Sequence, residues 1–267
     1  MNIRLPHTTS QDAWVEGRHG RLFVRSWAPT ESLPGAPILL LHDSLGSVEL
    51  WRGFPAALCK ATGRRVVAYD RCGFGHSDPH PGTLALDFIA REAEGDFAAV
   101  IDQLGIARFI VFGHSVGGGM AVNCAAHHGA ACVALITESA QAFVEDRTVA
   151  GLEDARALFS DPGQVERLKR YHGDKARWVL DAWIETWLHP DFAAWSLCAV
   201  LPQVTCPSLV IHGVDDEYGS PAHPQLITER SAGPARLELM ADTCHVPHRE
   251  REAKVVAMVR SFVATVG

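Results

Sequence analysis

Short, uninterrupted runs of apolar residues recur along this chain and alternate with segments of helical periodicity. Runs of this kind are typical of strands that are buried on both faces of a parallel sheet. We expect such strands at residues 37–42, 65–69, 108–112, 132–137 and 208–212, with another at 237–240. Residues 13–27 carry strand-forming side chains around a His19-Gly20 turn, and this pattern predicts a hairpin.

Apolar residues at helical spacing fill much of the chain between these runs. The periodicity predicts helices over residues 50–62, 86–104, 116–127 and 250–263. Because strands and helices then follow each other in turn, the pattern predicts an α/β fold. We expect a mostly parallel central β-sheet that is flanked by helices on both faces.

One long segment interrupts this alternation. Residues 143–204 contain two or three helix-like stretches and four of the seven tryptophans. No internal repeat, low-complexity tract or Pro/Gly-rich linker separates the segment from its surroundings. We therefore expect a core built from residues 1–142 and 205–267, into which residues 143–204 are inserted as a helical cap.

Composition and charge exclude several classes of protein. A chain of 267 residues with 47% hydrophobic and 21% charged residues is an ordinary globular composition, which argues against disorder, a coiled coil or a fibrous repeat. The 24 basic and 31 acidic residues give a net charge of −7, so the chain lacks the basic field that captures nucleic acid. We expect no nucleic-acid partner.

The apolar runs also bear on location. All of them fall far short of the ~20 residues that a membrane-spanning helix needs, so we expect no membrane partner. Residues 1–11 lack the apolar segment of a secretory signal, and we expect a cytoplasmic protein. The seven cysteines are widely scattered without a Cys-x-x-Cys pair, which favours free, mostly buried thiols.

Candidate chemistry begins at Gly113-His114-Ser115-Val116-Gly117. This Gly-x-Ser-x-Gly sequence follows an expected strand and opens an expected helix, which is the context that makes the pattern informative. A sharp turn between the two elements would expose the Ser115 hydroxyl in a strained backbone conformation, and glycines on either side leave room for it. The N-terminus of the helix offers free N–H groups to a developing oxyanion.

The chain resembles the α/β-hydrolases over nearly all of its length, because four landmarks of that family follow one another in the order that the family shows. The sequence at residues 42–46 resembles the oxyanion loop of that family, and residues 70–78 resemble its Asp-Arg-x-Gly-x-Gly-x-Ser loop. The serine turn is the third landmark. The fourth is formed by residues 213–216 and 244–248, which follow late strands where the family keeps its acid and its histidine.

The resemblance implies roles for particular residues. Ser115 would be the nucleophile, His245 the general base and Asp216 the acid that orients the imidazole. The acid of the family usually lies three residues beyond the glycine that ends the strand, and three residues beyond Gly213 is Asp216. The backbone N–H groups of Ser44 and Val116 would form the oxyanion hole.

One residue departs from the family pattern. Family members commonly carry glycine after the first histidine of the oxyanion loop, and this chain carries Asp43. If the resemblance holds, the carboxylate must point away from the oxyanion or pair with a cation. A structural and a functional role for Asp43 stay equally open.

These residues predict a serine hydrolase that attacks an activated carbonyl, an ester or a related thioester, lactone or amide, through an acyl-enzyme. A carbon–carbon hydrolase of a vinylogous 1,5-diketone is an alternative, and a hydrolase-like protein that binds a ligand without turnover is another. Serine at the turn disfavours dehalogenation. The motifs do not choose the substrate, and the sequence leaves the oligomeric state open.

The cap is expected to supply a substrate pocket for an apolar acyl or aromatic small molecule. Five aromatic residues of the cap are the candidates, and a role in holding the cap together is equally open for each of them: Trp178, Trp183, Trp187, Phe192 and Trp195. We expect no cofactor, because the serine turn lacks a dinucleotide fingerprint. The spacing Asp242-x-x-His245-x-x-His248 could pass for a metal-ligand set, but no Cys/His group supports it and we expect no metal.

Overall fold

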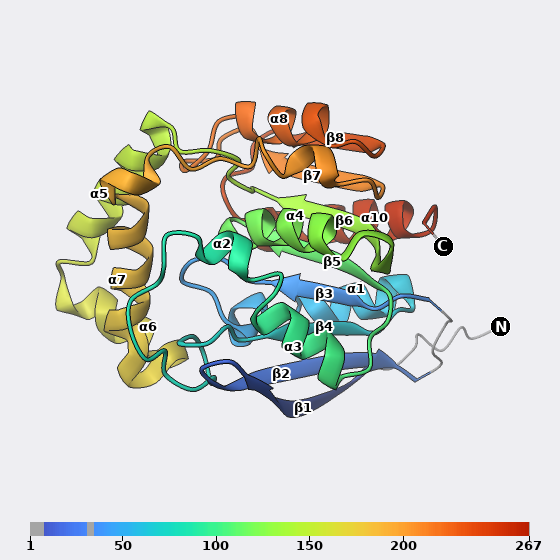
Figure 1. Ribbon diagram of the computed structural model, residues 1–267, viewed down its shortest axis with the longest axis horizontal. Helices are drawn as coiled ribbons and strands as arrows, with labels where there is room; N and C mark the ends of the chain where they lie inside the picture. The colour runs from blue at the N-terminus through green and yellow to red at the C-terminus, as the bar shows by residue number, and fades with distance from the viewer. Residues whose placement is uncertain (1–7, 31–34, 267) are drawn as a thin grey trace.

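A single mixed sheet forms the centre of the molecule. The structure is a computed structural model and describes residues 8–30 and 35–266 (Figure 1). The sequence prediction for residues 1–11 therefore falls largely on residues outside the described ranges. The strands run in the order β1-β2-β4-β3-β5-β6-β7-β8. The β1–β2 and β2–β4 pairs are antiparallel, and the other neighbouring pairs are parallel. Their bounds are Thr8–Gly17 (β1), Gly20–Pro29 (β2), Ile38–Leu41 (β3), Val66–Tyr69 (β4), Phe109–His114 (β5), Cys132–Glu138 (β6), Ser208–Gly213 (β7) and Ala235–Met240 (β8).

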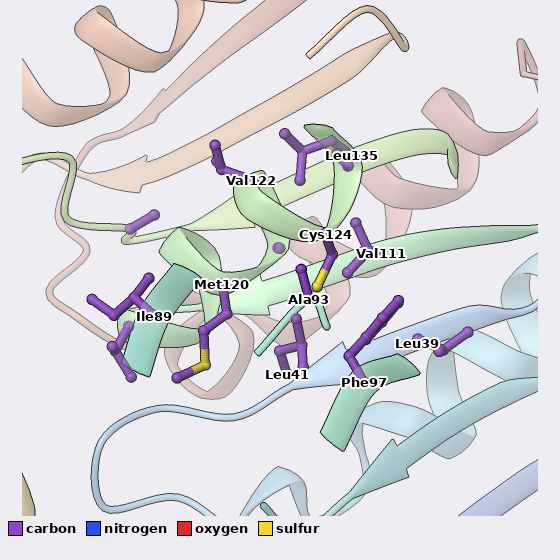
Figure 2. Packing of buried hydrophobic residues seen from close by; sticks show 14 of the residues in the cluster. Leu39, Leu41, Ile89, Ala93, Phe97, Val111, Met120, Val122, Cys124 and Leu135 are labelled. Carbon is purple, nitrogen blue, oxygen red and sulfur yellow. The ribbon is translucent and has the colours of Figure 1, made fainter. Parts of the chain in front are cut away.

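Alternate side chains of the central strands build two separate cores. Leu39, Val111 and Leu135 face one side of the sheet, where they pack with Phe97 and Met120 of the covering helices (Figure 2). Their strand neighbours, such as Leu40 and Phe112, face the opposite side. Since both faces are buried, each central strand must be apolar throughout, which is why the strands appear as continuous apolar runs in the sequence.

Helices cover both faces, as the alternation predicts. One face carries α2 (Phe88–Arg91), α3 (Asp96–Gln103), α4 (Val116–His128) and α8 (Ala222–Arg230), and the other carries α1 (Phe54–Thr62) and α10 (Glu252–Val263), which packs on α1 (Figure 1). Short helices precede α1 and α10 at Val48–Trp51 and at Pro247–Glu250 (α9). No helix in the described part of the chain is long and apolar enough to cross a membrane.

Two differences from the sequence prediction concern helices. The expected helix at 86–104 is divided into α2 and α3, because Gly95 adopts a non-helical conformation with φ −99° and ψ −115°. Helix α8 was not expected, since Pro224 stands within its first turn and its apolar periodicity is weak. Neither difference changes the order of the strands.

The segment between β6 and β7 lies beyond the carboxyl ends of the parallel strands (Figure 1). It contains α5 (Asp146–Leu158), α6 (Pro162–His172) and α7 (Ala176–Trp187), followed by short 3-10 turns at Pro190–Phe192 and Leu201–Gln203. Ligand sites of parallel α/β sheets form at these carboxyl ends. The division into a core and a cap at residues 143 and 204 stays our interpretation.

Candidate active site

Ser115 stands on a strained turn between β5 and α4. Its backbone has φ 57° and ψ −125°, a region that residues with a side chain rarely occupy. The turn is tight, because a Cβ atom on Gly113 would lie 2.0 Å from the carbonyl oxygen of Gly117, and one on Gly117 would lie 2.2 Å from that of Leu41. Glycine is therefore required on both sides of the serine.

His245 and Asp216 form a buried pair beside this turn. The Nδ1 atom of His245 lies 2.9 Å from both carboxylate oxygens of Asp216. The same carboxylate accepts the backbone N–H groups of Tyr218 and Gly219. Burial by itself would raise the pKa of Asp216, but the charge and hydrogen bond of His245 outweigh it and lower that pKa, so the carboxylate stays ionised. The neighbouring Asp215 is exposed.

Ser115 and His245 line the same cavity. Its volume is about 160 Å³, and the walls come from the loop after β3, the ends of β5 and β6, helices α5 and α7, and the loops after β7 and β8. The lining residues are Asp43, Ser44, Leu45, His114, Ser115, Gln141, Thr148, Leu152, Trp183, Trp187, Tyr218, His245 and Val246. The serine, the histidine and the acid, which lie far apart in the sequence, thus meet at one edge of the sheet.

The two residues whose N–H groups are the candidate oxyanion donors line a common small space. Ser44 lines the cavity itself, and Ser44 and Val116 together line a smaller space beside Trp183 and Trp187. Val116 is the first residue of α4, so its N–H has no carbonyl partner within the helix. A carbonyl oxygen above Ser115 could accept hydrogen bonds from both groups.

Asp43 pairs with the imidazole of His114, which is a cation when it is protonated, and pairing with a cation is one of the two arrangements that the sequence left open. Its carboxylate lies 3.3 Å from Nδ1 of His114 and also accepts the N–H of Leu45. Burial opposes ionisation of Asp43, but the hydrogen bond and charge of His114 outweigh it and hold the pKa far below its usual value. The pKa of His114 is raised: burial lowers it, and the carboxylates of Asp43 and Glu138 more than compensate.

A second buried carboxylate and imidazole lie behind His114. Nδ1 of His248 is 2.5 Å from Glu138 at the end of β6, and ligand atoms of His114, Glu138 and His248 all fall within 4.8 Å of one another. Burial lowers the pKa of His248, in spite of the Glu138 charge, which favours a neutral imidazole that donates to the carboxylate. Because the side chains bind each other, this group can be explained without a metal, and the absence of a metal stays a prediction.

The five candidate aromatic residues of the cap divide into two groups. Trp183 and Trp187 of α7 line the cavity. Phe192 and Trp195 stack on each other with ring planes 7° apart and contact Trp187, while neither borders the cavity. Trp178 also lies away from it: its indole N–H donates to the carbonyl oxygen of Gly82, and its ring stacks on His80. These three hold the cap and its neighbouring loops together.

Among the lining residues that were not found from the sequence, Gln141 and Tyr218 lie beside the candidate nucleophile and base. The Ser115 hydroxyl donates to Oε1 of Gln141 over 3.4 Å, and the Tyr218 ring lies 4.9 Å from the imidazole of His245. Gln141 follows β6, so its place at the carboxyl end of a parallel strand was a signal that could have indicated it. Tyr218 follows Asp216 by only two residues, and proximity to the acid was its signal.

Comparisons with known proteins identify the family. The model of the alpha/beta hydrolase fold family matches residues 36–176, which is more than half of the chain. The chain therefore belongs to the α/β-hydrolase fold family, a family of hydrolases, in agreement with the resemblance and with the mostly parallel sheet.

Curated relatives and solved structures agree with this assignment. Serine hydrolase BPHL of Homo sapiens is 28% identical over 218 residues, which cover 79% of this chain and 73% of the relative. The 2-hydroxymuconate semialdehyde hydrolase of Pseudomonas sp. (strain CF600) is 26% identical over 264 residues, 88% of this chain and 89% of the relative. Proline iminopeptidase of Mycobacterium smegmatis shares the fold, with a TM-score of 0.73 and 23% identity over 96% of this chain and 98% of that chain.

Proposed function

We propose that this protein is a serine hydrolase that cleaves a carboxylic ester, or a related thioester, lactone or amide, through an acyl-enzyme on Ser115. The observation that carries the proposal is the Asp216–His245 pair, whose histidine lines the same cavity as a serine held at positive φ. A nucleophile, a base and an orienting acid are the three groups that this chemistry needs.

Each side chain would have one task. His245 accepts the proton of the Ser115 hydroxyl while the oxygen attacks the carbonyl carbon of the substrate, and the N–H groups of Ser44 and Val116 stabilise the oxyanion. Asp216 fixes the tautomer of His245 and stabilises its charged form. His245 then returns the proton to the leaving group, and water hydrolyses the acyl-serine by the same steps.

The lining of the cavity supports a small apolar acyl or aromatic substrate. Leu45, Leu152, Trp183, Trp187 and Val246 supply apolar walls, and the space of about 160 Å³ is small. Apolar walls exclude water and favour apolar groups over charged ones. We therefore expect short acyl or single-ring substrates to be turned over faster than charged acids.

A fluorophosphonate probe tests this proposal. Intact-mass spectrometry should show one adduct, which peptide mapping assigns to Ser115, and Ser115→Ala should carry none. Turnover of 4-nitrophenyl esters by Ser115→Ala should fall by a factor on the order of 10⁶, and His245→Ala should be comparably inactive while remaining folded. An adduct on a different residue would contradict the assignment of Ser115.

Carbon–carbon hydrolysis is the second candidate reaction. Similarity to the 2-hydroxymuconate semialdehyde hydrolase over nearly the whole chain favours it. Steady-state turnover of a 4-nitrophenyl ester and of a ring-cleavage dienoate by the same preparation separates the two reactions. A ligand-binding protein without turnover would leave both substrates intact and would not react with the fluorophosphonate.

A further inference from the structure

Each ring nitrogen of His114 lies close to an oxygen of a different segment, one in an ion pair and the other in a hydrogen bond. Nδ1 lies 3.3 Å from the carboxylate of Asp43, and Nε2 lies 2.8 Å from the backbone carbonyl oxygen of His245. A carboxylate and a carbonyl oxygen can only accept. The geometry therefore fits an imidazolium that bridges the loop after β3 to the loop that carries His245.

His114, the centre of the bridge, is buried, and the bridge is anchored close to the candidate nucleophile. Only 1% of the His114 side chain is exposed. His114 precedes Ser115 directly, so one short segment both presents the serine and holds the backbone of the histidine that would deprotonate it. Asp43, in turn, occupies the position where family members commonly carry glycine.

We propose that Asp43 and His114 form a positioning pair that holds the backbone of His245 so that its imidazole is aligned with Ser115. The inference deepens the proposed function and rests on it. Neither residue takes part in bond making: Asp43 keeps His114 charged, and His114 holds the carbonyl of His245 in place. Misplacement of a reacting group by about 1 Å can cost on the order of 100-fold in rate, so such a pair would affect turnover more than binding.

The surroundings of His114 determine how it titrates. Two carboxylates face the ring, Asp43 from the loop after β3 and Glu138 from β6. The imidazoles of His245 and His248 lie 5.2 and 5.0 Å from its ring centre, and Arg249 and His42 act on Asp43. Burial lowers the pKa of His114, but the two carboxylates outweigh burial and raise this pKa above the ordinary value of histidine.

Deprotonation of His114 would leave one N–H for two acceptors. We therefore expect kcat of the wild-type protein to decline on the alkaline side of its profile. The amide of Asp43→Asn keeps an oxygen that can accept a hydrogen bond from His114, but this variant lacks the negative charge that raises the pKa of His114. This variant should move the alkaline decline to lower pH by at least about one unit.

Two substitutions of His114 separate its two contacts. The amide nitrogen of Gln reaches about as far as Nε2 of histidine, so His114→Gln can still donate to the carbonyl of His245. It should keep kcat within about threefold of wild type and lose the alkaline decline. The shorter His114→Asn can reach Asp43 but not that carbonyl, and should lower kcat by ~10-fold or more with little change in KM.

His128→Asn is the matched control. Nε2 of His128 lies 2.9 Å from the carbonyl oxygen of Ala93, so its contact resembles that of His114, but it lies away from the cavity. Loss of this bond should lower the melting temperature and leave both kcat and the pH profile unchanged. The substrate for all variants is 4-nitrophenyl butanoate, measured from pH 6 to pH 9.5.

Hydrogen exchange of residues 241–247 provides a readout that does not depend on turnover. Exchange should be faster in His114→Asn than in wild type and unchanged in His114→Gln. If Ser115 takes up no fluorophosphonate and no ester is cleaved, the proposed function fails and the exchange alone decides whether the pair holds this loop. Equal kcat and equal exchange in the Asn and Gln variants would overturn the proposal, as would an alkaline decline that Asp43→Asn leaves in place.

Discussion

Nδ1 of His245 lies 2.9 Å from each carboxylate oxygen of Asp216, whereas the adjacent Asp215 points into solvent. Two neighbouring aspartates in one turn thus have different environments. The difference follows from the backbone, because Asp216 also accepts the N–H groups of Tyr218 and Gly219, which turn the chain after β7. A comparison of the two aspartates therefore tests the role of the acid directly.

Asp216→Asn should reduce kcat by about 10⁴, because the neutral amide no longer fixes the tautomer of His245 or stabilises its charge. Asp215→Asn is the control and should leave kcat nearly unchanged. Steady-state kinetics with a 4-nitrophenyl ester measures both. The opposite pattern of losses would move the role to Asp215.

Trp183→Ala and Trp187→Ala should change the acyl-chain preference, since both indoles line the cavity. Either substitution enlarges the space and should raise the relative kcat/KM for longer acyl chains. Trp195→Ala, in the aromatic group behind the cavity, should lower the melting temperature but keep the order of preference. Relative rates across a series of 4-nitrophenyl esters decide this. If neither Trp183→Ala nor Trp187→Ala changed the relative rates across the series, the result would argue against a pocket lined by the cap.

Gly117→Ala should destabilise the fold, because the new Cβ would lie 2.2 Å from the carbonyl oxygen of Leu41 and the backbone of β3 cannot yield easily. We expect a loss of about 1–3 kcal/mol in the free energy of unfolding. Gly119→Ala on the same helix is the comparison. Its Cβ would lie 3.3 Å from a side-chain atom of Ile89, so a small adjustment suffices and the helix gains propensity. Denaturant unfolding of both variants measures the contrast, and equal losses would show that the clash is relieved.

Glu92 should make the stability of the protein depend on pH. Burial, assisted by the charge of Asp96, raises the pKa of Glu92 to about 7, and Tyr69 donates its hydroxyl to this carboxyl group. The pKa of Glu92 is higher in the folded state than in the unfolded state, so protonated Glu92 favours folding. This contribution to the free energy of unfolding is complete below about pH 4.5 and is lost as pH rises through about 7. Between these two pH values the free energy of unfolding should fall by up to about 3 kcal/mol.

Glu92→Gln should remove this part of the pH dependence, because its amide oxygen still accepts from Tyr69 and carries no charge at any pH. The exposed Glu94→Gln, two residues away, should leave the pH dependence as in the wild type. Unfolding free energies at pH 5 and pH 8 give the comparison. A Glu92→Gln protein whose stability still falls like that of the wild type would show that another group titrates.

The sequence determined the strands, the serine turn and the family, because the signals for these features are local. A strand that is buried on both faces must be continuously apolar, and glycine at 113 and 117 is dictated by contacts within a few ångströms of the turn. The spacing of Asp216 from Gly213 is equally local. Each of these constraints is written in a few consecutive residues and can be recognised there.

The tertiary structure alone decided which side chains meet. Asp43, His114 and His245 come from three segments that meet at the carboxyl edge of the sheet, so no spacing in the sequence indicates that Asp43 pairs with His114 or that His114 contacts the backbone of His245. The division of the five candidate aromatic residues into cavity walls and cap packing depends in the same way on how α7 lies over the sheet. Periodicity fixes which residues share a helix face, but the partner of that face is set by packing between distant segments.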